Sequence, residues 1–400
     1  MSKLYEIIEK PLSGEWGSDD DLGNGIPVLR TTNFTNEGDI NYSNVVTRII
    51  EAQKAKEKFL NYGDIIIEKS GGSPAQPVGR VVFFEGEEEK YLFNNFTSVL
   101  RLKDKKNNFP RYLFYFLFSS YKKGKTRKFQ NKTTGILNLK LDRFLKEIEI
   151  PIPPLETQKQ IAENLDTAAE ILAMRKQQLA ELDNLITSIF YDMFGDPLIN
   201  EKGWDAVILG DLITVLTDYH ANGSYESLRD NVQLLDKPDY ALMIRTTDLE
   251  NQNYEDNVKY ITKEAYDYLE KSKVFGGEII INKIGSAGKV YLMPYLNRPV
   301  SLAMNQFLLR FNDKTNVLYV YYFLATDFSE KNIKDRVRGA VTKTITKDAV
   351  RSIPIILPPL SLQTQFAEIV TKIREQKALV QKAIDETQYL FDSLMSEYFD

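Results

Sequence analysis

Two long stretches of the chain carry apolar residues at alternating intervals of four and three. The first stripe lies between residues 161 and 189, and the second lies between residues 366 and 394. Every position of the first stripe is apolar except Arg175, and every position of the second is apolar except Lys377 and Thr387. A spacing of this kind held over about four heptads is typical of a coiled-coil seam rather than of a helix on a globular core. The predicted helix-helix seam residues are Ile161, Leu165, Leu172, Leu179, Leu182, Ile186, Phe366, Val370, Ile373, Val380, Ile384 and Phe391.

Each predicted helix opens with nearly the same peptide, "PPLETQKQI" in the first case and "PPLSLQTQF" in the second. The proline pairs at 153–154 and 358–359 cannot lie inside a helix, so they mark its start. Gly195 and Pro197 end the first helix, and the second continues almost to Asp400.

The segment that precedes each predicted helix is also duplicated. The tripeptide Arg-Thr-Thr precedes a β-branched run entered through glycine, "GDIII" or "GEIII", and a Gly/Ser-rich loop follows. "VGRVVFF" then parallels "AGKVYLM", and "YLFYFLF" parallels "YVYYFLA". The β-branched runs predict strands, and Ala/Lys/Glu-rich helical patches at 51–60 and 263–272 precede them. Because strands and helices interleave in this way, we expect one α+β unit present in two copies.

These patterns predict two tandem, pseudo-symmetric α/β domains separated by two long helices that pair as an antiparallel coiled coil. A parallel pairing would require the second domain to span the full length of the helices. Each seam spans about 40 Å at 1.5 Å per residue, comparable to one turn of B-DNA, about 34–36 Å. The predicted domains are 1–150, the helix 151–196, the second domain 197–352 and the C-terminal helix 353–400.

Composition narrows the class of protein. The length of 400 residues suits two domains or more, and 43% apolar with 27% charged residues is normal for a globular protein. No apolar stretch approaches the roughly 20 residues of a membrane helix, and the N-terminus lacks the features of a signal peptide. The absence of cysteine excludes disulfides and thiolate chemistry and fits a reducing cytoplasm, and the short apolar stretches predict no membrane partner. A net charge of −5 means that any nucleic-acid surface must come from local basic patches.

The sequence offers few residues for catalysis. Its one histidine, His220, lies in the polar stretch "TDYHANGS" without a counterpart in the first repeat, and such a residue is usually solvated. The stretch "IGSAGKV" is not a phosphate loop, because Lys283 and Val290 replace the first glycine and the hydroxyl residue of that motif. No Gly-rich methyl-donor or dinucleotide loop follows a predicted strand.

Asp64 with Glu88 and Lys90 is the remaining catalytic candidate, since metal-dependent nucleases combine carboxylates with a lysine. The second repeat has Asn297–Pro299 where the Glu88–Lys90 stretch would fall, and it carries no carboxylate there. We therefore interpret "EGEEEK" as a solvated acidic turn and predict neither a catalytic residue nor a metal site.

Basic residues concentrate at matching places in the two repeats. "YKKGKTRKFQNK" (121–132) holds six basic residues and no acidic one, and "KNIKDRVRGAVTKTITK" (331–347) holds six with Asp335. Lysine and arginine can neutralise backbone phosphates while the intervening polar residues reach base edges, and the glycines after each strand allow close approach to a groove. A solvated lysine-rich loop is the alternative, which the duplication disfavours. The candidate DNA-binding residues are Lys69, Ser70, Arg80, Lys122, Lys123, Lys125, Arg127, Lys128, Lys132, Lys283, Ser286, Lys289, Lys334, Arg336, Arg338 and Lys343.

The motifs in this order resemble the specificity subunit of a type I restriction-modification system. R-T-T, G-[DE]-I-I-I and G-[RK]-V stretches, then P-P-L-x-x-Q and a long helix, occur twice and cover nearly the whole chain. The repeated helix opening is the specific element, because the strand motifs alone are weak. One departure is the entry to the second helix, "SIPIILPPL", which has Pro354 and a longer lead than "EIPIPPL".

The resemblance implies that each domain is a target-recognition domain that reads one half of a bipartite sequence in double-stranded DNA. The paired helices would set the spacer between the halves and dock two methyltransferase (modification) subunits. S-adenosylmethionine would be bound by those subunits, and ATP and Mg²⁺ would be used by restriction subunits in the full complex. This chain would then be non-catalytic and carry no cofactor of its own.

Two alternatives stay open at this point. A symmetric coiled-coil adaptor whose end domains bind proteins would show the same repeats, and an enzyme that uses the acidic cluster would lose its activity in Glu88→Ala. The role of the duplicated glutamines is also open, because Gln158, Gln160, Gln363 and Gln365 fit either capping of the first turn or contact with the methyltransferase.

Overall fold

The computed structural model describes residues 1–133 and 135–400, which form two compact units. Unit 1 comprises Met1–Lys176 and Lys382–Asp400, and unit 2 comprises Gln177–Gln381. Two long helices, α5 (Leu155–Phe194) and α12 (Leu360–Phe399), begin directly after the proline pairs, as predicted. The structure thus groups each globular part with one half of each helix, instead of setting the helices apart as separate domains.

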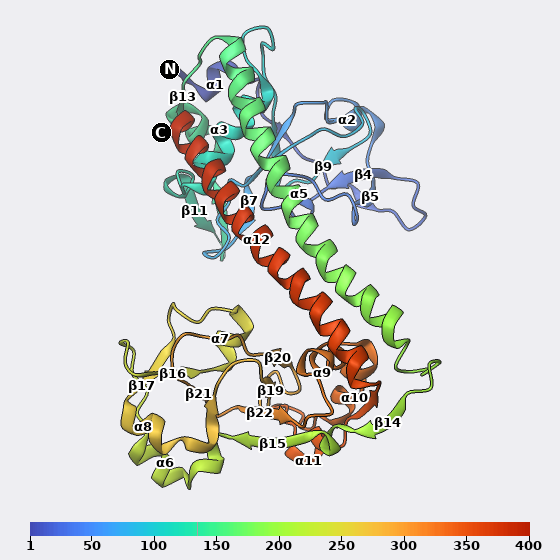
Figure 1. Cartoon of the computed structure of the whole chain (residues 1–400). Helices are drawn as coiled ribbons and strands as arrows, with labels where there is room; N and C mark the ends of the chain where they lie inside the picture. The colour runs from blue at the N-terminus through green and yellow to red at the C-terminus, as the bar shows by residue number, and fades with distance from the viewer. Residues whose placement is uncertain (134) are drawn as a thin grey trace. The chain divides into compact units, whose positions relative to one another are not determined.

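The globular part of unit 1 is built from small sheets and short helices (Figure 1). One four-stranded sheet has the order β2 (Leu12–Ser13), β10 (Thr97–Leu100), β6 (Ile65–Glu68), β8 (Val81–Phe83). A second has the order β3 (Ser18–Asp19), β5 (Val46–Ile49), β4 (Ile26–Leu29), β9 (Leu92–Phe93). The remaining strands are β11 (Gln130–Thr133), β12 (Ile136–Leu139) and β7 (Ser70–Gly72) in one sheet, and β1 (Ser2–Lys3) with β13 (Glu149–Ile150). The helices are α1 (Leu4–Ile7), α2 (Ala52–Lys56), α3 (Pro110–Lys122), α4 (Leu141–Glu147) and the 3-10 helices η1 (Thr31–Asn33) and η2 (Arg127–Phe129).

The globular part of unit 2 has two corresponding four-stranded sheets. The first has the order β15 (Ile213–Asp218), β22 (Gln306–Phe311), β19 (Ile279–Asn282), β20 (Val290–Leu292). The second has the order β17 (Lys259–Ile261), β16 (Ala241–Ile244), β21 (Val300–Leu302), β18 (Lys273–Val274), and β14 (Asp205–Ile208) pairs with β23 (Pro354–Leu357). The helices are α6 (Tyr225–Asn231), α7 (Thr246–Asn251), α8 (Lys263–Tyr268), α9 (Val317–Leu324), α10 (Asp327–Arg336), α11 (Lys347–Arg351) and the 3-10 helices η3 (Leu209–Asp211), η4 (Tyr219–Asn222) and η5 (Glu270–Ser272).

The strand pairing confirms the predicted duplication and the α+β class. In both units the β-branched strand, β6 or β19, lies inside the first sheet and is fully buried. The strand that directly precedes Arg-Thr-Thr has a parallel partner in both units: β4 pairs with β9, and β16 pairs with β21. Its pairings with the neighbouring strands β5 and β17 are antiparallel. Because a parallel pair within a largely antiparallel sheet requires a crossover connection, its presence in both units reflects one topology used twice.

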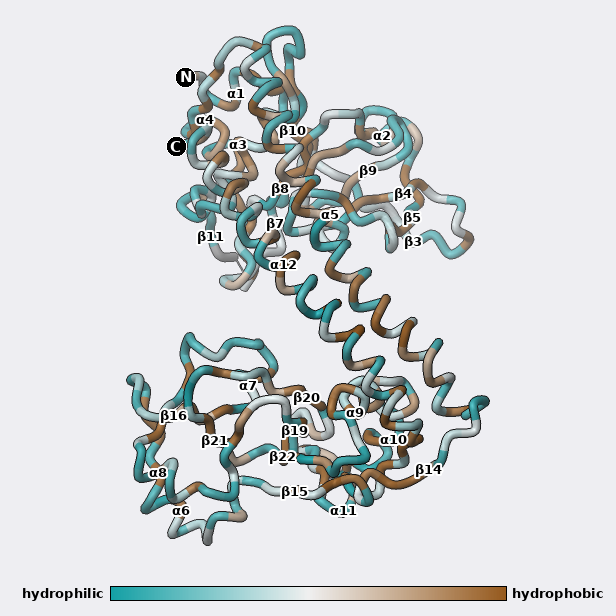
Figure 2. Tube along the Cα trace, in the orientation of Figure 1, coloured by the Kyte–Doolittle hydropathy of each residue, from teal (hydrophilic) through white to brown (hydrophobic). Residues whose placement is uncertain are grey.

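The predicted seam lies on the inner faces of the two long helices, within each unit. Apolar and polar residues follow one another within the turns of both helices in Figure 2, as expected when one face of each helix forms a coiled-coil seam. The buried seam residues are Leu165, Leu172, Ile186, Phe366, Val370, Ile373, Ile384 and Phe391, and the half-buried ones are Ile161, Leu179, Leu182 and Val380.

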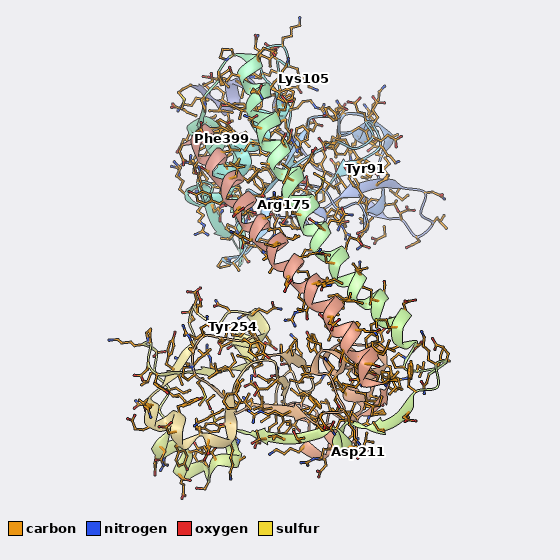
Figure 3. The ribbon with its side chains drawn as sticks, viewed as in Figure 1. Tyr91, Lys105, Arg175, Asp211, Tyr254 and Phe399 are labelled. Atoms are coloured by element: carbon orange, nitrogen blue, oxygen red, sulfur yellow. The ribbon has the colours of Figure 1, made fainter. Side chains whose placement is uncertain are left out.

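In unit 1 the start of α5 and the end of α12 share one hydrophobic core with α3. Leu165 is fully buried, and Phe391, Met395 and Phe399 are almost fully buried in the same cluster. The ring of Phe399, which is labelled in Figure 3, lies 5.4 Å from that of Tyr112, centroid to centroid. The core of unit 1 is therefore completed by the last turns of the chain.

In unit 2 the opposite ends of the two helices meet. Phe190 and Phe194 of α5 pack on Phe366 of α12, with ring centroids 5.6 Å and 5.3 Å apart, and Phe194 packs on Tyr319 of α9 at 4.8 Å. Since the start of α5 meets the end of α12 in unit 1 and the reverse holds in unit 2, the helices run antiparallel, and this prediction is confirmed.

The polar positions of the seam are also partnered. Arg175 donates hydrogen bonds to the Ala383 carbonyl and the Thr387 hydroxyl in unit 1 (Arg175 is labelled in Figure 3). Lys377 forms an ion pair with Asp183 in unit 2. Because a polar seam residue is satisfied only when its partner lies opposite, these contacts oppose slippage of one helix along the other.

Candidate nucleic-acid interface

In unit 1 the glycine-rich loop and the basic segment, which the sequence identified separately, lie side by side. The loop begins at Lys69, whose carbonyl accepts a hydrogen bond from the Leu139 amide at 2.8 Å. Strand β7 of the loop pairs with β12, which follows the basic segment. Gln130 Nε2 donates to the Val78 carbonyl at 2.9 Å. The loop and the segment therefore form one continuous surface.

Unit 2 repeats this juxtaposition. The Ile345 amide donates to the Lys283 carbonyl at 3.0 Å, and the Gly285 amide donates to the Lys343 carbonyl at 3.1 Å. Gly71 and Gly285 occupy the same place in the two loops with φ of +100° and +84°, and a Cβ added at either would meet no atom within 4 Å. Glycine is thus required for the left-handed backbone, and the space beside it is open.

The predicted basic residues divide into solvated cations and cations that hold the fold. The solvated set has exposed side chains in both units and consists of Lys122, Arg127, Lys128, Lys289, Lys334, Arg338 and Lys343. Lys125 is half-buried, and the side chain of Lys132 lies outside the described residues. The exposed cations of each unit are the ones available to neutralise phosphates.

Arg80 differs from the sequence-based expectation. Its side chain is buried, with 7% of the residue exposed, and Nη2 donates to the Thr31 carbonyl at 2.7 Å while Nη1 donates to the Phe34 carbonyl at 3.2 Å. Its Nε lies 3.4 Å from Glu68 Oε2, and burial raises the pKa of Glu68 although Arg80 opposes that shift. Arg80 therefore holds the Arg-Thr-Thr turn against β6 rather than presenting a free guanidinium.

Other predicted cations are engaged in local structure. Lys123 forms an ion pair with Asp400 at 2.6 Å, which ties the basic segment to the end of the chain. Arg336 donates to the Ser352 carbonyl and to the Asn332 carbonyl, at 2.9 Å and 2.8 Å. These residues brace the segment that carries the exposed cations.

Lys283 and Lys347 share one carboxylate in unit 2. Their ammonium groups lie 3.1 Å and 3.0 Å from the two oxygens of Asp218 at the end of β15. Burial acts to raise the pKa of Asp218, but hydrogen bonds from Lys347 and Lys283 overcome it and hold the pKa below its ordinary value. The glycine-rich loop of unit 2 is thereby fastened to the sheet and to α11.

The equivalent lysine of unit 1 is less firmly bound. Lys69 Nζ donates to the Ser13 hydroxyl at 3.2 Å, and burial together with the nearby Lys58 lowers the pKa of Lys69. The predicted serines also have local partners, because Ser70 donates to Asn138 Oδ1 at 2.5 Å and Ser286 donates to Glu250 Oε1 at 2.8 Å.

The Arg-Thr-Thr turns adjoin the segments that carry the glycine-rich loops, although the sequence indicated them only as repeat markers. Arg80 Nη2 donates to the Thr31 carbonyl at 2.7 Å, and the Thr246 hydroxyl donates to Asn282 Oδ1 at 3.3 Å. Arg30 and Arg245 donate through Nη2 to the carbonyls of Asn44 and Asn257, at 2.9 Å and 2.6 Å, and so hold the turn from beneath. The second threonine of each turn is exposed, Thr32 in unit 1 and Thr247 in unit 2. The signal available in the sequence was the recurrence of Arg-Thr-Thr in both repeats.

Asp64 and Glu88 of the acidic cluster each accept hydrogen bonds from neighbouring groups. Asp64 is 1% exposed and accepts hydrogen bonds from Arg101 Nε and Nη2 at 2.7 Å and 2.6 Å. Glu278, its counterpart in unit 2, accepts from Arg310 Nε at 3.0 Å. Glu88 accepts the Tyr62 amide, and over residues 1–133 and 135–400 no group of three or more His, Asp or Glu residues is placed to hold a metal ion.

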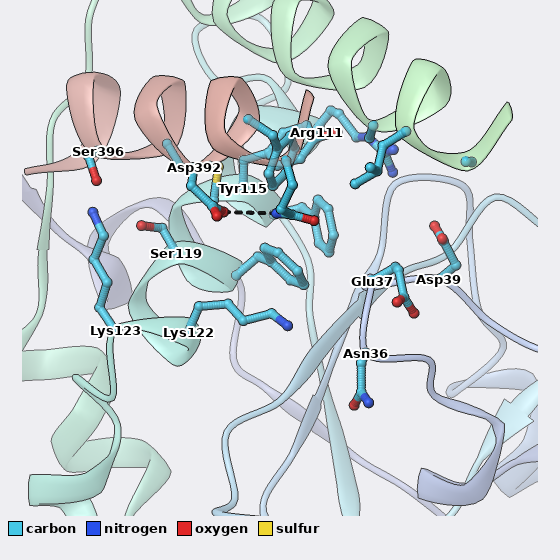
Figure 4. Close-up of a pocket in the computed structure, with 18 of the residues that line it drawn as sticks. Asn36, Glu37, Asp39, Arg111, Tyr115, Ser119, Lys122, Lys123, Asp392 and Ser396 are labelled. Carbon is cyan, nitrogen blue, oxygen red and sulfur yellow. Dashed lines mark hydrogen bonds between the residues drawn. The ribbon is translucent and has the colours of Figure 1, made fainter. Parts of the chain in front are cut away.

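A cavity of about 650 Å³ lies in unit 1 between α3, the middle of α5 and the end of α12 (Figure 4). Apolar residues such as Phe114, Phe118 and Phe391 form much of its wall, and both acidic and basic side chains line it. Burial raises the pKa of Asp39 at its edge, and Tyr115 donates a hydrogen bond to Asp166 nearby. Its lining includes neither histidine nor cysteine.

His220, the one histidine, is exposed and lines a separate cavity of about 480 Å³ in unit 2, together with Arg229 and Arg245. Its ring contacts Tyr219 edge-on at 5.6 Å. Over the described part of the chain, none of the helices has the length and apolar content needed to cross a membrane.

The comparisons with known proteins agree with the duplicated architecture. The type I restriction modification DNA specificity domain matches residues 1–184 and again residues 201–388. The MjaX protein of Methanocaldococcus jannaschii, a putative type I restriction enzyme specificity subunit, is 24% identical over 96% of this chain and 89% of its own length. A putative type I restriction enzyme specificity subunit of Haemophilus influenzae is 24% identical over 93% of this chain and 91% of its own length.

Solved structures show the same fold at low identity. The S subunit of a type I restriction-modification system from M. genitalium aligns with a TM-score of 0.60 and 16% identity, over 100% of this chain and 95% of that chain. A chain from a type I R-M system studied for complex assembly and conformational transition aligns with a TM-score of 0.55 and 14% identity, over 100% and 96%. With two family domains at the two repeats, the chain belongs to the family of type I restriction-modification specificity subunits.

Proposed function

We propose that this chain is the DNA-reading subunit of a type I restriction-modification complex and that it performs no chemical step itself. Each globular part reads one half of a bipartite target in double-stranded DNA, and the antiparallel helices set the gap between the halves. The observation that carries the proposal is the duplicated juxtaposition of glycine-rich loop and basic segment, joined at Lys69 and Leu139 in unit 1 and at Lys283 and Ile345 in unit 2.

Both surfaces carry exposed basic residues, but the loops beside these residues differ between the two units. Arg127 and Lys128 in unit 1 and Lys343 in unit 2 are exposed beside the glycine-rich loops. Unit 1 follows its basic segment with the β11–β12 hairpin, whereas unit 2 has an irregular loop bridged between Arg338 and Thr344. Phosphate contacts position a protein on DNA and base contacts specify the sequence, so this combination supports similar docking with different half-sites.

Exposed apolar residues on the long helices support the docking of two partner subunits. Met174 and Leu390 in unit 1 are 60% and 52% exposed, and Leu379 and Leu185 in unit 2 are 69% and 45% exposed. Counted from the first residue of each helix, Met174 matches Leu379 and Leu185 matches Leu390. Each unit therefore presents one exposed apolar residue from each of the two matched helix positions, which suits one methyltransferase subunit per unit.

The partners would hold the cofactors. S-adenosylmethionine would belong to the methyltransferase subunits, and ATP with Mg²⁺ would belong to restriction subunits in the full complex. Asp64 and Glu278 are each paired with an arginine, and among the residues that the structure describes no group of three or more His, Cys, Asp or Glu residues is placed to hold a metal ion.

The test is a selection of random-sequence DNA duplexes by the purified full chain, followed by sequencing of the bound fraction. We expect a split motif with one fixed gap, and we expect exchange of residues 1–150 for those of a relative to change one half of the motif. A symmetric protein–protein adaptor would select no sequence. A change in both halves after the exchange would contradict the assignment of one half-site to each unit.

A further inference from the structure

A glutamine in the first turn of α5 is buried where this helix joins the globular part of unit 1. Gln158 is 1% exposed, and its Oε1 accepts the Phe109 amide hydrogen at 2.9 Å. Its Nε2 donates to the carbonyls of Asn107 and Pro153, at 3.0 Å and 2.8 Å. Asn107 and Phe109 lead into α3, whereas Pro153 belongs to the entry of α5. One side-chain amide therefore joins the helix to the globular part of unit 1.

Unit 2 contains the same joint. Gln363 is fully buried, and its Oε1 accepts the Asn316 amide hydrogen at 2.8 Å. Its Nε2 donates to the carbonyls of Lys314 and Pro358, at 3.4 Å and 2.8 Å. Asn316 caps α9, which is the counterpart of α3. The two joints thus use the same three kinds of contact, one backbone amide and two backbone carbonyls, in both units.

Glutamine is the side chain that this joint requires. A primary amide offers an acceptor oxygen and two N–H donors on one plane, which match one backbone N–H and two carbonyls. The proline pair at the helix entry supplies carbonyls but no N–H groups, so the backbone alone provides few hydrogen bonds there. Two residues later, Gln160 and Gln365 are exposed, and Gln160 donates to Asn164 of its own helix.

We propose that Gln158 and Gln363 are positioning residues that fix the orientation of each globular part on the helix that follows it. They thereby make the chain selective for one gap between half-sites. This role rests on the proposed DNA-reading function. One base pair more or less displaces a half-site by about 3.4 Å along the axis and rotates it by about 34–36°. A globular part that is held rigidly on its helix cannot move to the displaced half-site, whereas one whose glutamine hydrogen bonds are lost can.

The experiment compares the wild-type full chain with Gln158→Met and with the matched control Gln160→Met. The half-sites selected from random duplexes are placed on duplexes whose gap equals the selected one or differs by one base pair, and Kd is measured for each. We expect Gln158→Met to lower the preference for the selected gap at least tenfold, about 1.4 kcal/mol, and Gln160→Met to keep it. Binding to a duplex with a single half-site should stay within about twofold in both variants.

The outcomes separate the inference from the function on which it rests. A Gln158→Met chain that keeps the wild-type gap preference overturns the positioning role, while a wild-type chain that selects no split motif overturns the DNA-reading function itself. If Gln158→Met fails to fold, Gln158→Glu retains the volume and the acceptor but loses both donations, and Gln363→Met tests the other joint. Unchanged gap preference in every folded variant contradicts the proposal.

Discussion

The buried carboxylate of Asp64 is a place where a structural role and a catalytic role make opposite predictions. Asp64 receives two hydrogen bonds from Arg101 and one from the Asn61 amide at 2.8 Å. The contact links the start of β6 to the end of β10, at the centre of the first sheet of unit 1. We predict that Asp64→Asn destabilises unit 1 and leaves DNA selection by the folded chain unchanged.

The size of the destabilisation follows from the loss of one acceptor oxygen of Asp64. Asparagine replaces one acceptor oxygen by an NH₂ group, so a donor of Arg101 or Asn61 would face another donor. Removing one partner of a buried ion pair costs about 3–5 kcal/mol. The Arg101 side chain is 19% exposed, so water reaches part of the guanidinium and the lower limit of about 3 kcal/mol applies. For a unit of this size, that loss lowers Tm by about 6–12 °C.

The two tryptophans allow the units to be followed separately. Trp16 belongs to unit 1 and Trp204 to unit 2, and the chain has no others. Thermal unfolding monitored by selectively excited tryptophan fluorescence in a Trp204→Phe background reports unit 1, because Trp16 is then the one tryptophan. The matched control is Asp21→Asn, which neutralises an exposed carboxylate of the same unit.

The reasoning is refuted if Asp64→Asn unfolds at the wild-type midpoint, or if Asp21→Asn lowers the midpoint equally. A nuclease activity of the isolated chain that is abolished by Glu88→Ala would instead restore the catalytic reading of the acidic cluster.

Three further predictions concern pH, salt and assembly. The lysine contacts of Asp218 lower its folded-state pKa. The stabilisation from these contacts is therefore present above the unfolded-state pKa of about 3.9 and is lost as pH falls through the folded-state pKa. Asp218→Asn should flatten the acid dependence of the unfolding of unit 2, followed by the fluorescence of Trp204. Replacing Arg127 and Lys128 by glutamine should reduce the slope of log K against log salt by about 0.9 per lost phosphate contact, and an unchanged slope would place DNA elsewhere. Leu379→Glu should reduce the methyltransferase subunits bound per chain from two to one, measured by native mass spectrometry, and retention of both would argue against that docking surface.

Patterns that act locally along the chain predicted a large part of the architecture. The proline pairs and the alternating spacing located α5 and α12 and their buried faces, because helix entry and helix periodicity depend on neighbouring residues. The internal repeat predicted two units of one fold, and it indicated that each basic segment and glycine-rich loop occurs twice. Their adjacency was not visible in the sequence, since the bond between Lys69 and Leu139 joins segments far apart along the chain.

The tertiary structure alone decided which polar residues are free to act. Arg80 and Arg127 are both arginines in predicted DNA-binding segments, yet the first is buried against the Thr31 carbonyl and the second is exposed. Gln158 and Gln160 stand two residues apart in the same helical turn, yet the first is buried in the joint and the second faces solvent. The chain sequence determines the elements and their duplication, because these follow from local propensity and period. Burial and hydrogen-bond partners depend on segments brought together by folding, and they decide which of the same residue types hold the structure and which remain available to DNA.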